Sequence, residues 1–193
     1  MEDPIVQENL LLDAVNILLE TINDLPIEDE SEYTNFLEAR QARSKIIEVT
    51  RAVLSERWDF NTDTNYTFPL DMQGMIPVPN NVLDIVGNLG DVIMRNWKLY
   101  SKSNQSHVFT EEVPCTVVWL FDFNTLTHPL RHYITIRAAR IFSARTIGDE
   151  KAIKFNEIDE EDARLAARRS ETRTGQYNML GSRYGVDSLA RIN

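Results

Sequence analysis

The sequence predicts an α+β fold, with a four-helix portion formed by the N- and C-terminal thirds of the chain and a small antiparallel β region inserted between them. Apolar residues recur at helical spacing before residue 57 and again after residue 128, which is typical of amphipathic helices. Between these stretches, β-branched and aromatic residues occur with asparagine, glycine and proline, which is typical of short strands joined by turns.

We therefore expect four segments along the chain. These are a helical pair over 1–57, the β region over 58–127, a second helical pair over 128–174 that completes the bundle, and an extended C-terminal arm over 175–193. A chain of 193 residues, with 42% hydrophobic and 26% charged residues, is long enough to bury a sizeable core without disulfides or metals.

The first helix is expected to begin at Asp3 and Pro4, because aspartate can cap a helix and proline suits its first position. An apolar stripe follows as far as Ile22, and Pro26 is expected to end the helix. An exposed acidic loop over 24–32 comes next, since this segment holds acidic residues and no basic one.

A second amphipathic helix is expected from about Asn35 to Arg57. In the β region, we expect strands over 82–86, 91–100 and 116–123. The residues between the first two strands, Gly87-Asn-Leu-Gly90, predict a hairpin turn, because they are too few for a phosphate-binding loop and no Lys-Ser or Lys-Thr follows.

A third helix is expected after His128-Pro129 and should end near Gly148. A fourth is expected from about Asp149 to Arg173, with its acidic residues before its arginines, an order that complements the helix dipole. Within it we expect an ion pair between Glu160 and Arg164, four residues apart. Its apolar face is thin, so much of this helix should face water or another subunit.

The formal net charge of −10 and the pI near 4.8 disfavour a protein that grips nucleic acid over its whole surface, because such proteins use clustered lysine and arginine. The single cysteine, Cys115, has no partner within the chain, and the first residues lack the pattern of a secretory signal. With no apolar run of membrane-spanning length, we expect synthesis and folding in a reducing cytoplasm and no membrane insertion.

Two enzymatic or metal-binding arrangements are conceivable, and neither is favoured. His128 and His132 have the spacing of a metal-binding pair, but Pro129 places the first at a helix cap and no third ligand is near in sequence. Glu111 and Glu112 could be offered as glycosidase carboxylates, but neighbours on a strand point to opposite faces. We expect no catalytic residue, no cofactor and no bound metal, and we interpret Cys115 as a small core residue.

The third helix is unusual because it carries a basic strip, Arg131, Arg137, Arg140 and Arg145, with no acidic residue between Asp122 and Asp149. On an acidic protein, such a strip calls for an acidic counterpart. One candidate is the acidic beginning of the next helix in the same chain, and the other is the same surface on a neighbouring copy. The acidic residues in question are Glu157, Asp159, Glu160, Glu161 and Asp162.

The C-terminal stretch GQYNMLGSRYGVDSL, residues 175–189, has neither helical nor strand periodicity. Its glycines allow the backbone to bend, and its large apolar and aromatic side chains suit the crevices of a partner. We interpret it as a docking arm for a partner protein or an adjacent subunit; the alternative is a tail folded back on its own helices. The expected anchors are Tyr177, Met179, Leu180, Tyr184 and Leu189.

Several stretches, taken in order from about residue 14 to residue 181, resemble the tail tubular protein A family of short-tailed bacteriophages. They are AVNILLETINDLPI, ARQARSKIIEVTRAVLSERWDFN, IPVPNNVLDIV, RNWKLYSKS, HPLRHYITIRAARIF, NEIDEEDARLAARRSE and YNML. The sequence departs from the family pattern at Ser101, where an acidic residue is expected, and at His128-Pro129, where Leu-Pro or Met-Pro is more usual.

The resemblance implies a structural protein of the virion tail, made in the host cytoplasm, that forms a homo-oligomeric adaptor ring, a dodecamer, between the portal and the tail nozzle. The portal is then the expected partner of the C-terminal docking arm, with an adjacent subunit as the other candidate. The nozzle would be of the tail tubular protein B type, with tail fibres as a further neighbour, and duplex DNA would pass through the lumen during genome ejection. A net-acidic lumen would repel DNA and let it slide. The alternatives are a tail component with glycan or cell-wall hydrolase activity, and a monomeric acidic binding module that uses the loop at 24–32.

Overall fold

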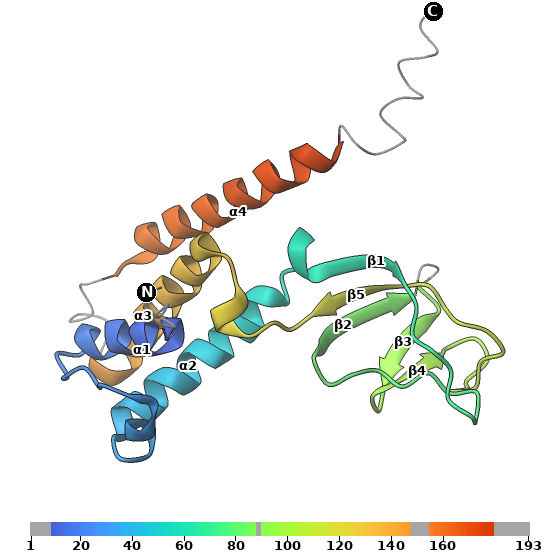
Figure 1. Cartoon of the computed structure of the whole chain (residues 1–193), viewed down its shortest axis with the longest axis horizontal. Coiled ribbons are helices and arrows are strands. Elements are labelled where there is room, and N and C mark those ends of the chain that lie inside the picture. The colour runs from blue at the N-terminus through green and yellow to red at the C-terminus, as the bar shows by residue number, and fades with distance from the viewer. Residues whose placement is uncertain (1–8, 88–89, 148–154, 180–193) are drawn as a thin grey trace, which may run out of the picture. The chain divides into compact units, whose positions relative to one another are not determined.

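The computed structural model describes residues 9–87, 90–147 and 155–179, with side chains described as far as Thr172. The chain divides into two compact units, one built from Met1–Thr50 with Asp122–Asn193 and the other from Arg51–Phe121. The first unit contains helices and the second a sheet (Figure 1). The fold is therefore α+β, as the sequence predicts.

The helical unit takes its framework from four α-helices in the described residues. They are α1 (Leu10–Thr21), α2 (Leu37–Leu54, whose last residues belong to the sheet unit), α3 (His128–Ile147) and α4 (Glu157–Met179). Two 3₁₀ turns, η1 (Glu30–Thr34) and η3 (Phe123–Thr125), lie in the connections. None of these helices has the length and apolar character needed to span a bilayer.

The ends of α1 differ from the prediction. The helix begins at Leu10 instead of Asp3, with Asn9 as its cap: the Asn9 side-chain oxygen accepts a hydrogen bond from the Leu12 amide at 3.2 Å. It ends at Thr21, before Pro26, because Asn23 adopts a left-handed φ of 58° that stops the helix. Asp3 and Pro4 lie outside the described residues.

The ends of the other helices depend on local capping. α3 begins at His128, whereas the helix was expected after His128-Pro129, and it continues to Ile147, close to the end expected near Gly148. The prediction that α4 begins near Asp149 was wrong: Phe155 and Asn156 are not helical, and α4 begins at Glu157. The helix also continues to Met179, so residues 175–179, which were expected to belong to the extended arm, are helical.

Helix α3 lies between α1 and α4 (Figure 1). On one side, Arg137 and Arg140 reach Glu160 of α4. On the other, Arg131 and Thr135 line a hollow shared with α1. At about 100° per residue these two pairs of α3 side chains point in opposite directions, so α1 and α4 occupy opposite sides of α3. Its buried residues accordingly surround much of the helix; they include Leu130, Tyr133, Ile134, Ile136, Ala138, Ala139 and Phe142.

The sheet unit contains five antiparallel strands in the order β1-β5-β2-β3-β4. They are β1 (Thr62–Tyr66), β2 (Val82–Gly87), β3 (Val92–Arg95), β4 (Lys98–Ser101) and β5 (Cys115–Trp119). The core of this unit contains Phe68, Ile76, Val82, Ile85, Leu99, Cys115 and Val117. Cys115 is fully buried and burial raises the pKa of its thiol, which fits a core residue rather than a nucleophile.

The predicted strand over 91–100 is two strands joined by a tight turn. Arg95 pairs with Lys98, and the two residues between them, Asn96 and Trp97, have φ values of 53° and 57°. This is the geometry of a type I′ hairpin, which favours asparagine but is unusual for tryptophan. The turn between β2 and β3 was predicted correctly, and Gly90 donates a backbone hydrogen bond to Gly87 at 2.8 Å.

Asn61 fastens the end of α2 to the sheet within the second unit. Its amide nitrogen donates to the carbonyl oxygens of Leu54 at 2.9 Å and Trp119 at 2.8 Å, and its side-chain oxygen accepts from the Trp58 amide at 2.9 Å. Trp58 is 1% exposed and donates its indole N–H to the Val53 carbonyl at 2.8 Å. Hydrogen bonding therefore explains why tryptophan and asparagine stand three residues apart in Trp-Asp-Phe-Asn.

Replacing Asn61 with alanine should destabilise the sheet unit by about 2–4 kcal/mol, because several buried backbone groups would lose their partners at once. The sequence has three tryptophans, Trp58, Trp97 and Trp119, and all lie in this unit, so tryptophan fluorescence during urea unfolding reports on it. The matched control is Asn80→Ala, at an exposed asparagine of the same unit. Equal stability losses in the two variants would contradict the role assigned to Asn61.

Candidate interaction surfaces

The two central arginines of the basic strip are held by α4 of the same chain. Arg140 Nε lies 2.6 Å from Glu160 Oε2, and Arg137 Nε lies 3.5 Å from Glu160 Oε1. Arg137 also donates a hydrogen bond to the Tyr133 hydroxyl at 2.8 Å. The Glu160 side chain is only 17% exposed, so this carboxylate joins α3 to α4 in a partly desolvated position. For these arginines, the acidic counterpart is the next helix in the chain.

The two outer arginines of the strip have different surroundings. Arg131 donates a hydrogen bond to the carbonyl oxygen of Leu126, just before the start of α3. Arg145 is exposed, near the other end of the helix. The pKa of the Glu48 carboxyl in α2 is lowered, chiefly by a hydrogen bond from Lys45 and to a smaller extent by the charge of Arg145. The strip is therefore not one continuous contact surface.

The acidic residues at the start of α4 make different kinds of contact. Asn156 caps the helix by accepting from the Ile158 and Asp159 amides at 2.8 and 3.0 Å, and Asp159 accepts from the Asn156 amide at 2.9 Å. The predicted Glu160–Arg164 pair is wrong: Glu160 binds the α3 arginines, and Arg164 instead lies 3.6 Å from Glu161. The side chains that remain exposed in this cluster are Glu157, Glu161 and Asp162.

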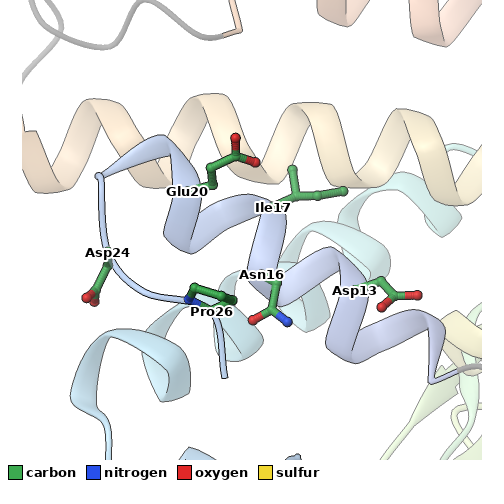
Figure 2. A pocket seen from close by; sticks show the side chains of 6 residues that line it. All are labelled: Asp13, Asn16, Ile17, Glu20, Asp24 and Pro26. Carbon is green, nitrogen blue, oxygen red and sulfur yellow. The ribbon is translucent and has the colours of Figure 1, made fainter. Parts of the chain in front are cut away.

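Sequence reasoning did not identify a hollow of about 290 Å³ beside α1, which we term the acidic hollow. Figure 2 shows its lining side chains. Asp13, Asn16, Ile17 and Glu20 come from α1, while Asp24 and Pro26 come from the loop that follows. Three of the six carry carboxylates and none is basic. The hollow therefore suits a cationic or amphipathic side chain of a partner better than an anion.

Backbone hydrogen bonds hold the loop of the acidic hollow against α1. The amides of Asn23 and Asp24 donate to the carbonyls of Glu20 and Leu19 at 3.2 and 3.1 Å, which is the Schellman arrangement at a helix end. Asn16 then clasps Ile27: its side-chain amide donates to the Ile27 carbonyl at 3.0 Å and its oxygen accepts from the Ile27 amide at 2.9 Å. The hollow is thus formed by a fixed loop.

A second, shallower hollow of about 160 Å³ lies between α1 and α3, and we term it the histidine hollow. Its lining includes His128, His132, Arg131 and Asp13, and the two imidazole rings are nearly parallel with centroids 6.4 Å apart. In the part of the chain that the structure describes, no group of three or more histidine, cysteine, aspartate or glutamate side chains is arranged to hold a metal ion. Asp13 and Ile17 line both hollows and so separate them.

The other residues singled out from the sequence are two glutamates of the sheet unit and the expected anchors of the C-terminal arm. Glu111 and Glu112 are both exposed in the sheet unit. Tyr177 and Met179 lie in the last turns of α4, and nothing further is described of their side chains. The other expected anchors of the arm, Leu180, Tyr184 and Leu189, lie outside the described residues.

The chain matches a family model described as tail tubular protein over residues 12–177. The matched range begins in α1, includes all five strands of the sheet unit and ends in α4, so it covers both compact units. A search of curated proteins found no match.

Replacing Glu160 with glutamine should lower the free energy of unfolding of the helical unit by about 1–2 kcal/mol, since Arg137 and Arg140 would lose their shared counter-charge in a partly buried position. Far-UV circular dichroism during urea unfolding measures this loss. Glu161→Gln is the control, because its pair with Arg164 is exposed and should contribute less than about 0.5 kcal/mol. A loss in Glu161→Gln as large as in Glu160→Gln would count against the bridge.

Proposed function

We propose that this chain, which belongs to the tail tubular protein family and is a structural protein of the phage tail, forms the adaptor ring between the portal and the tail nozzle. The observation that carries the proposal is the family match over both compact units. The ring would be a dodecamer through which the genome is ejected. The basic and acidic strips, from Arg131 to Arg145 and from Glu157 to Asp162, remain candidates for contacts with the portal or with neighbouring copies.

The division into two units supports a role between two different partners. An adaptor must present one surface to the portal and another to the nozzle, and two compact units in one chain can supply these surfaces separately. We assign the helical unit to the ring and portal and the sheet unit to the nozzle. The half-exposed Trp97 at the tip of the β3–β4 hairpin is a suitable anchor on the sheet unit, because a rigid aromatic side chain adds contact area at little entropic cost.

The charge of the chain supports the passage of DNA without binding. The net charge of −10 gives a ring of many copies a strongly acidic character. Duplex DNA is repelled by such a surface, and proteins that hold DNA instead gather lysine and arginine on it. Part of the basic complement is neutralised inside the chain, since Arg137 and Arg140 contact Glu160. We expect the lumen to guide DNA and not to recognise its sequence.

Deletion of residues 180–193 tests the proposed docking arm. A truncation after Met179 keeps all of α4 and removes Leu180, Tyr184 and Leu189. The full chain should assemble as a ring on purified portal, and the shortened chain should bind portal at least about tenfold more weakly because it has lost apolar anchors. Cryo-electron microscopy of the portal mixtures measures ring formation, and titration measures affinity.

The outcomes of this experiment separate the alternatives. Normal assembly of the shortened chain would mean that the C-terminal residues are not a docking arm. A full chain that stays monomeric with portal present would contradict the adaptor role and favour a monomeric binding module. The helical content of both proteins serves as the control for folding, because the deletion leaves every described helix in place.

A further inference from the structure

The side of α4 that faces away from α3 carries two exposed apolar residues and two exposed charged residues. Ala163 and Ala167 are buried, whereas Ile158 is 72% exposed and Leu165 is 42% exposed. Asp162 and Arg169 are also exposed, and each lies four residues beyond one of these apolar residues. Residues four and seven apart share one side of a helix. We term this set, Ile158, Asp162, Leu165 and Arg169, the outer face of α4.

The outer side of α1 has an apolar residue between two hollows, and the hollow toward its C-terminal end is lined by carboxylates. Ile17 is partly exposed and separates the acidic hollow, at the C-terminal end of α1, from the histidine hollow, at its N-terminal end. Glu20 and Asp24 line the acidic hollow, Arg131 lines the histidine hollow, and Asp13 lines both. The first basic residue in the sequence is Arg40, so the acidic character extends over the whole of α1 and its following loop.

These two surfaces lie on opposite sides of the helical unit. Both α1 and α4 pack on α3, from opposite directions (Figure 1). A protein with complementary patches on opposite sides can join head to tail, and such heterologous contacts close into rings when the rotation between copies permits. A patch that bound its own equivalent would instead produce a closed dimer.

We infer that the outer face of α4 docks on α1 of the next copy in the ring, with the two helices running in the same direction. Leu165 then packs on Ile17, and Arg169 enters the acidic hollow between Glu20 and Asp24. The contact rests on the proposed ring, and it assigns the surfaces through which neighbouring copies meet.

Spacing and charge select this direction. Asp162 and Arg169 are seven residues apart, about 10.5 Å along a helix, the same separation as Asp13 and Glu20 on the receiving surface. With parallel helices, Arg169 approaches Glu20, and Asp162 approaches the histidine hollow, where Arg131, His128 and His132 accompany Asp13. Reversing α4 would place Asp162 in the acidic hollow, which is lined by three carboxylates and no basic side chain, so the like-charge contact would have no cation to offset it.

A charge exchange tests the contact. Arg169→Glu alone and Asp24→Arg alone should each weaken assembly on portal about tenfold, because each puts like charges together at the contact. The double variant, with both substitutions in every copy, restores opposite charges and should recover assembly to within about threefold of the unchanged protein. Arg40→Glu is the matched control: it makes the same charge change at an exposed arginine of α2, outside the proposed contact.

The readout is the fraction of portal that carries a complete ring, measured by mass photometry, with circular dichroism to verify the fold of each variant. A double variant that assembles no better than the weaker single variant would overturn the contact, as would equal losses in Arg169→Glu and Arg40→Glu. If the unchanged protein and Arg40→Glu both failed to assemble, the proposed adaptor function itself would be contradicted. Ring formation by the unchanged protein without recovery in the double variant would reject this contact alone.

Discussion

The organisation of the helical unit depends on one constraint on α3. This helix packs against other helices on opposite sides, and it also carries arginines that need counter-charges. Its apolar residues pack in more than one direction, and Arg137 and Arg140 converge on Glu160 of α4. One carboxylate thus serves as the shared counter-charge of two arginines in a partly buried position, where a charge without any partner would be costly. The bridge holds α4 on one side of α3 and α1 lies on the other, so each of these two outer helices keeps one side for solvent or a partner.

This arrangement bears directly on assembly. The charge that sequence reasoning assigned to a single basic strip is divided between an internal bridge, a helix-start contact at Leu126 and an exposed arginine at 145. The surfaces that we propose for neighbouring copies are the outer face of α4 and the hollowed surface of α1, which lie on opposite sides of α3. A tail protein of this family that assembles as an oligomer needs repeated contacts between copies. Two unlike surfaces on one unit meet this requirement.

The sequence predicts the features that depend on local chemistry. The apolar periodicity of α2, the start of α3 near His128 and the turn at Gly87–Gly90 all follow from residue types. It does not predict features set by tertiary contacts. Asn9 caps α1, where Asp3 was expected, and Asn156 caps α4, for which the sequence indicated no cap. The partners of Glu160 lie on another helix, and the loop of the acidic hollow is held by two hydrogen bonds between Asn16 and Ile27. Tryptophan rarely occupies a left-handed turn position and usually indicates a strand. The turn at Asn96 and Trp97 between β3 and β4 was therefore not predicted.

The most direct test of the ring account is covalent capture of the contact between copies. Cysteines introduced as Ile17→Cys and Leu165→Cys in one chain would lie together across a head-to-tail contact, while the native Cys115 is buried and should not react. Oxidation of portal-bound protein, followed by denaturing electrophoresis, should give a ladder from dimers to long oligomers, because every copy both offers and receives one cysteine. Cross-linking that stops at dimers, or none in a preparation that has formed rings, would contradict the proposed arrangement.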